Sequence, residues 1–173
     1  MISADWCRLM AAYNSEMNRR LYAAAGAVPD AARRAECGAF FGSLHGTLCH
    51  LLWADRIWMS RFAGWPKPPG GIKESPRLIE DWESLRAARA EADAEIESWA
   101  AGLGQDWLAR PFTWFSGATG REMTRPAWVL VAHLFNHQTH HRGQAHCLVT
   151  QAGIRTEDTD LPWAVDLKAL GLE

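Results

Sequence analysis

The stretch LVAHLFNHQTHHRGQAHCL, residues 130–148, places histidines in the middle of an apolar helical seam. Steps of four and three residues along a helix follow one face. This face reads Leu130, Leu134, His137, His141, Gln144 and Leu148. A helical bundle normally fills such central positions with Leu or Ile. Burying imidazoles costs stability unless their nitrogens have partners, and a metal ion provides one. The stretch therefore predicts a helix whose buried face carries part of a metal site.

Four segments have the apolar spacing of amphipathic helices. They cover residues 3–25, about 31–62, about 75–99 and 124–151. The first ends at Gly26, ahead of a proline, and the second ends before the GWPKPPGG stretch at residues 64–71. Four such segments predict an all-α protein with the architecture of a four-helix bundle.

Capping residues and turns set the expected boundaries of the later elements. Ser75 is expected to cap the third helix and Thr124 the fourth, each shortly before a proline. Between these helices, PFTWFSGATGREM (residues 111–123) places aromatic residues before a Gly-Ala-Thr-Gly turn, which is typical of a short hairpin or ordered loop. The tail beyond residue 153 is expected to be a loop with one short helix.

Length and composition limit the class of protein. A chain of 173 residues with 48% apolar and 22% charged residues suits a single globular domain spanning residues 1–173. The net charge of -2, without a basic stripe, argues against a nucleic-acid partner. No apolar segment approaches the roughly 20 residues of a membrane span, and the start, MISADWCRLM, lacks the features of a signal peptide. We therefore expect a cytoplasmic protein with no membrane partner.

The four cysteines are far apart and form no C-x-x-C pair. This spacing argues against a disulfide framework and against a zinc site built from thiolates. Cys49 and Cys147 are expected to be small buried residues.

A metal site needs a third ligand from another helix. His137 and His141 are four residues apart, so their Cβ atoms lie roughly 6 Å from each other and both rings can reach one ion, but zinc and similar ions usually take at least three protein ligands. The second predicted helix offers His45 and His50, about 140° apart at roughly 100° per residue. His50, in the apolar stretch LCHLLWAD, is the expected third ligand.

The remaining histidines are expected to play other parts. His133 precedes His137 by about one turn, and we expect it in the core or supporting a ligand instead of binding the ion. His140 and His146 point away from the seam and are expected to be solvated. HQTHH also has the spacing of the zinc-protease motif H-E-x-x-H, but Gln138 stands in place of the glutamate that serves as general base. The protease hypothesis fails at that residue.

Three polar residues near the predicted ligands have candidate roles. Asp55 is expected to be a supporting or structural partner, with Arg142 as one candidate for its contact. Arg142 could instead hold an anionic group of a substrate. Gln144, one turn beyond His141, is expected to orient a ligand or a bound water.

The histidine motifs of the chain resemble those of a known protein family. His50 within HLLWADRIW, together with AHLFNHQTHHRGQ at residues 132–144, is similar to the DinB superfamily, which includes YfiT-like metal-dependent proteins. The resemblance extends over most of the chain, including the Pro/Gly break, the hairpin-like insert and the NHxxxHRGQ segment. It implies a four-helix bundle that forms homodimers, with a divalent metal held by His50, His137 and His141.

The resemblance implies small-molecule chemistry without settling the reaction. Three neutral imidazoles leave a coordination position for water or substrate, and a bound ion lowers the pKa of such a water or thiol. We expect Zn²⁺ or Ni²⁺, although imidazole also suits copper and iron. Thiol transfer with a low-molecular-weight thiol, or hydrolysis, is the expected activity on a small-molecule substrate. Two alternatives stay open: a metal-binding stress or DNA-damage-inducible protein without catalysis, and a plain bundle whose histidines are only hydrogen-bonded.

Overall fold

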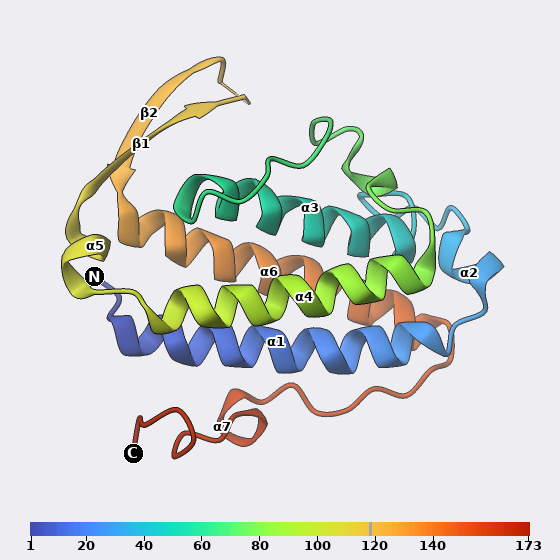
Figure 1. Ribbon diagram of the computed structural model, residues 1–173. Helices are drawn as coiled ribbons and strands as arrows, with labels where there is room; N and C mark the ends of the chain where they lie inside the picture. Colours follow the sequence, from blue (N-terminus) through green and yellow to red (C-terminus); the bar gives the residue numbers. More distant parts are fainter. Residues whose placement is uncertain (118) are drawn as a thin grey trace.

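Four long helices make up most of the computed structural model, which describes residues 1–117 and 119–173. They lie side by side along most of their length (Figure 1). Helix α1 contacts α4 and α6, and α3 contacts the same two helices. The prediction of a mostly helical chain is confirmed. The bounds of the long helices are α1 Ala4–Gly26, α3 Leu44–Phe62, α4 Trp82–Ala101 and α6 Ala127–Gln151.

Shorter elements connect the long helices or follow them. They are α2 Asp30–Arg34, the 3-10 helix η1 Ser75–Arg77, α5 Gln105–Ala109, β1 Pro111–Ser116, β2 Arg121–Pro126 and α7 Leu161–Ala164. Strands β1 and β2 form an antiparallel hairpin in which Ser116 lies opposite Arg121. The hairpin projects from one end of the long helices (Figure 1). It confirms the predicted insert, although residue 118 of the predicted turn lies outside the described residues. Helix α7 confirms the short helix expected in the tail.

The predicted helix over residues 31–62 is confirmed for residues 44–62 and wrong in its continuity, because the chain is interrupted between α2 and α3. Gly38 and Gly42 have φ angles of 73° and 79°, which lie in the left-handed region. Glycine adopts this region at little cost. Ser43 then caps α3, because its hydroxyl accepts a hydrogen bond from the Gly46 backbone N–H at 3.0 Å. Residues 35–43 are therefore free to fold back over the start of α3.

The predicted caps of the third and fourth helices are also wrong. Ser75 begins only a single 3-10 turn, and α4 starts later, capped by the Asp81 carboxylate that accepts from the Ser84 N–H at 2.7 Å. Thr124 lies in β2, where its hydroxyl is 2.8 Å from that of Thr113. Strand pairing continues to Pro126, so α6 starts at the following residue.

A buried ion-pair network crosses the space between the long helices. Arg89 of α4 is 2% exposed and donates to the Asp55 carboxylate of α3 at 2.6 Å. A second Arg89 nitrogen, Nη2, lies 2.8 Å from Asp93 Oδ1. Asp93 also accepts from the Asn18 side chain of α1 at 2.9 Å, and Asp55 accepts from the amide of Gln138 on α6. The network thus joins all four long helices, and Asp55 pairs with Arg89 instead of Arg142.

The burial of the cysteines differs from the expectation in one case. Cys49 is buried as predicted, whereas Cys147 is exposed on α6, so the prediction for Cys147 is wrong. Among the described residues, no helix combines the length and the apolar character that crossing a membrane would require.

Candidate metal centre

Helices α3 and α6 bring three imidazoles together. His50 of α3 and His137 and His141 of α6 each offer a nitrogen atom, and these atoms all lie within 4.8 Å of one another. The Nε2 atoms of His50 and His137 are 3.3 Å apart. His45 lies elsewhere, because its Nε2 is 2.9 Å from the backbone oxygen of Ile79. These three rings are the ones that the spacing of the sequence singled out.

A serine fixes which nitrogen of His50 carries the proton. His50 Nδ1 lies 2.8 Å from the hydroxyl oxygen of Ser75. That hydroxyl donates its only hydrogen to the backbone oxygen of Ile72 at 2.7 Å. It can therefore only accept from His50, so Nδ1 is the protonated nitrogen and Nε2 presents its lone pair to the cluster.

Gln144 has the same effect on His141. The Gln144 side-chain oxygen lies 2.7 Å from His141 Nδ1. An amide oxygen only accepts hydrogen bonds, so His141 Nδ1 carries the proton and Nε2 is left bare. The amide nitrogen of Gln144 lies 3.3 Å from His140 Nε2, which can accept from it. Gln144 thus lies where its spacing from His141 predicted a residue that orients a ligand.

The charge state of the cluster suits a metal ion. Burial, together with the smaller effect of neighbouring imidazoles, lowers the pKa of both His50 and His137 to about 3. Burial also lowers the pKa of His141, against the opposing effect of its bond to Gln144. The three rings are therefore neutral at pH 7, which is the form that binds metal. Three neutral imidazoles, each with a nitrogen within 4.8 Å of the others, are a donor set that fits a divalent transition metal.

The cluster contains no carboxylate. Over the described part of the chain, these histidines are the one group of three or more His, Cys, Asp or Glu side chains close enough to share an ion. Asp55, one turn beyond His50, is fully buried and is bound to Arg89 and Gln138. It supports the packing of the helices and lies outside the cluster.

An aromatic residue covers the cluster. The Phe41 ring stacks on His50 with 3.7 Å between centroids and meets His141 edge-on at 5.2 Å. Phe41 was expected within a helix, and the structure places it in the segment that precedes α3. Gly46 permits this approach, because a Cβ on Gly46 would lie 2.3 Å from the backbone oxygen of Phe41. In the sequence, the feature that indicates this contact is a glycine in the first turn of a helix.

Substituting Gly46 with alanine is expected to push the Phe41 backbone away from His50. We expect the free energy of unfolding to fall by about 1–3 kcal/mol, as for other overpacked sites, and the midpoint of urea denaturation measures this. Gly143→Ala is the matched control. A Cβ on Gly143 meets no atom within 4 Å, so this variant should gain about 0.5–1 kcal/mol from helix propensity. Equal effects of the two substitutions would contradict the role of Gly46.

The other histidines occupy different surroundings. His133 is exposed, with its ring 5.6 Å from that of His137 and 5.3 Å from Trp58, so the expectation of a core position is wrong. His140 is exposed, as predicted. His146 was expected to be solvated, but it is half-buried and lies 2.6 Å from the Thr156 hydroxyl.

The comparison with known proteins agrees with the resemblance seen in the sequence. The chain matches the DinB family over residues 2–170. No curated protein and no solved structure matches it. Because the family match covers nearly the whole chain, the protein belongs to the DinB family.

Proposed function

We propose that the protein is a metal-dependent enzyme that acts on small molecules, by thiol transfer or by hydrolysis. His50, His137 and His141 would hold the ion, with Zn²⁺ or Ni²⁺ as the preferred metal. The observation that carries the proposal is that one nitrogen of each ring lies within 4.8 Å of the others, while Ser75 and Gln144 engage Nδ1 of His50 and of His141 and leave their Nε2 atoms bare. Family membership supports the proposal.

The protein's side chains favour thiol transfer over hydrolysis. When bound, a divalent ion with a free coordination position lowers the pKa of water or of a thiol and so supplies a nucleophile at neutral pH. Hydrolysis commonly uses a carboxylate as general base, but the histidine cluster contains none. The buried carboxylate of Asp55 is already bound to Arg89. A low-molecular-weight thiol needs less help, because thiols are more acidic than water.

Two residues beside the cluster have roles in this proposal. Phe41 covers His50 and excludes water from one side of the site. His133 is exposed next to His137, and neither of its ring nitrogens is hydrogen-bonded to another described residue. It is therefore free to accept the proton that a bound thiol loses. The proposal further includes a four-helix bundle that pairs as a homodimer, in keeping with the family resemblance.

Turnover of a thiol with an electrophile tests the proposal. Protein without an affinity tag, stripped of metal and reloaded with Zn²⁺ or Ni²⁺, is mixed with a low-molecular-weight thiol and an aryl halide. We expect metal-dependent release of halide as the carbon–sulfur bond forms. His137→Ala should lose both metal and activity, whereas His133→Ala should keep the metal and lose about 10²-fold in rate.

The same assay separates the proposal from its alternatives. A protein that binds one equivalent of metal but turns over neither thiols nor ester substrates would be a metal-binding protein without catalysis. Equal rates for the loaded protein and His137→Ala would contradict a metal-dependent reaction.

A further inference from the structure

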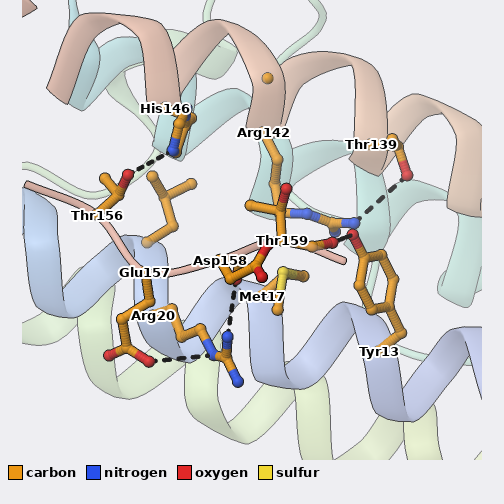
Figure 2. A pocket seen from close by; sticks show the side chains of 12 residues that line it. Tyr13, Met17, Arg20, Thr139, Arg142, His146, Thr156, Glu157, Asp158 and Thr159 are labelled. Atoms are coloured by element: carbon orange, nitrogen blue, oxygen red, sulfur yellow. Dashed lines mark hydrogen bonds and ion pairs between the residues drawn. The ribbon is translucent and has the colours of Figure 1, made fainter. Parts of the chain in front are cut away.

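We infer that a second ligand site lies on another face of α6, in a cavity that binds a small monocarboxylate with a short apolar body. The cavity has a volume of about 190 Å³ and lies between α1, α6 and residues 156–159 of the tail (Figure 2). Its lining residues on α6 are Thr139, Arg142, Gly143 and His146. Their spacing of three, four and seven residues places them on one face of the helix. That face is distinct from the one that carries His137 and His141.

Arg142 supplies the charge that a carboxylate would meet. Its side chain is 7% exposed, and Figure 2 shows its guanidinium among the residues that line the cavity. Its nitrogens donate to oxygens of Asn14, Gln138 and Thr139, none of which carries a charge. Within residues 1–117 and 119–173, no carboxylate oxygen lies within 4.0 Å of this guanidinium. Buried cations usually have an anionic partner. An anion in the cavity would therefore stabilise the side of the Arg142 guanidinium that faces it.

The two carboxylates of the buried network pair with an arginine other than Arg142. Asp55 lies 2.6 Å from Arg89, and Asp93 lies 2.8 Å from the same guanidinium. One arginine therefore pairs with both carboxylates. Among the described residues, hydrogen bonds link Arg142 to them through the neutral side chains of Asn14 and Gln138.

Gly143 keeps the cavity open. It lies inside α6, where glycine is the poorest helix former apart from proline. Packing does not require it, because a Cβ at this position meets no atom within 4 Å. The position is thus one where a side chain would occupy the cavity without disturbing its walls.

The remaining lining defines the size and polarity of the ligand. Met17 and Leu21 of α1 are buried and provide an apolar wall. Two backbone oxygens of the tail are already engaged: Tyr13 donates to the Thr159 backbone oxygen at 2.6 Å, and Arg20 donates to that of Asp158 at 2.7 Å. A volume below the roughly 300–1,000 Å³ of drug-sized sites implies a small ligand. Glu157, which lies 3.5 Å from Arg20, and Asp158 are exposed lining residues, and their negative charges disfavour a ligand with a second carboxylate.

Binding of a matched pair of probes to the metal-free full chain tests the inference. The probes are 3-methylbutanoate and its neutral amide, 3-methylbutanamide, followed by protein-detected NMR. We expect saturable shifts at Gly143 with the carboxylate and about tenfold or weaker binding of the amide, because the amide lacks the charge-assisted bond to Arg142. Metal-free protein is used so that a carboxylate cannot bind at the histidine cluster. The outcome is therefore independent of the proposed enzymatic function.

Three substitutions extend this test. Gly143→Leu should fill the cavity and weaken carboxylate binding about tenfold or more, whereas Gly143→Ala should weaken it far less. Arg142→Gln should abolish the preference for the carboxylate over the amide, and the Gly143 pair decides the matter if Arg142→Gln does not fold. The inference is overturned if the carboxylate gives no saturable shifts, if the amide binds equally well, or if Gly143→Leu binds like the wild type.

Discussion

Replacing Arg89 with methionine is expected to lower the free energy of unfolding by about 3–5 kcal/mol at pH 7, the usual cost of removing one partner of a buried ion pair. The Arg89 side chain is the shared partner of Asp55 and Asp93, and both carboxylates are buried. The substitution leaves both without a counter-charge. Urea denaturation of the purified variant measures the loss.

The loss of stability in Arg89→Met should increase as the pH rises. Burial raises the pKa of Asp93 to about 6, although the charge of Arg89 lowers it. Without Arg89 this pKa rises further. A carboxyl group whose pKa is higher in the folded than in the unfolded protein favours folding when protonated, and it loses that contribution as the pH rises through the folded pKa. The deficit of Arg89→Met should therefore be larger at pH 8 than at pH 5.

A neighbouring arginine provides the control. Arg86 lies one turn earlier on α4, is 48% exposed and pairs with Glu83 on the surface. Arg86→Met should change the stability by no more than about 0.5 kcal/mol. Adding Asp55→Asn and Asp93→Asn to Arg89→Met should recover part of the loss, because the unpaired charges are then removed. If Arg89→Met costs no more than Arg86→Met, the network does not stabilise the fold.

Deleting a ligand or its support is expected to have the largest effect on metal binding. His141→Ala should abolish high-affinity binding of Zn²⁺, because only two imidazoles remain. Gln144→Ala should weaken binding by about 10–100-fold, as when the hydrogen-bond partner of a ligand is removed. The physical reason is that Gln144 holds the His141 ring in the tautomer that presents Nε2. Competition with a zinc chelator at pH 7 measures both affinities.

Gln151 is the matched control for Gln144. It lies on the same helix and is exposed, and its side chain makes one hydrogen bond within the described residues, to the sulfur of Cys147 at 3.5 Å. Gln151→Ala should bind Zn²⁺ like the wild type. If Gln144→Ala does the same, the tautomer of His141 is set by something other than Gln144.

The three clustered histidines could be predicted because their placement depends on local geometry. His137 and His141 share a helical face through their spacing alone, and His50 stands in a helix among apolar neighbours. The supporting residues could not all be found in this way. Gln144 lies on the same helix as His141, but Ser75 reaches His50 from a separate turn, and that contact exists only after the chain has folded.

The parts of the fold that the sequence did not reveal are those that depend on contacts between distant segments. Apolar spacing predicted the four long helices, because burial of one face gives the same pattern in any packed helix. It did not predict the segment that carries Phe41 over His50, which Gly46 makes possible. It also did not reveal Arg89, because a single arginine in a helix gives no sign of being buried between two carboxylates.

X-ray absorption spectroscopy of the zinc-loaded protein, prepared without an affinity tag, shows which atoms bind the ion. We expect a zinc ion bound by three imidazole nitrogens from the protein, with no sulfur ligand, and loss of this signal in His50→Ala. A sulfur ligand, or an unchanged spectrum in His50→Ala, would contradict the claim that α3 and α6 share one ion.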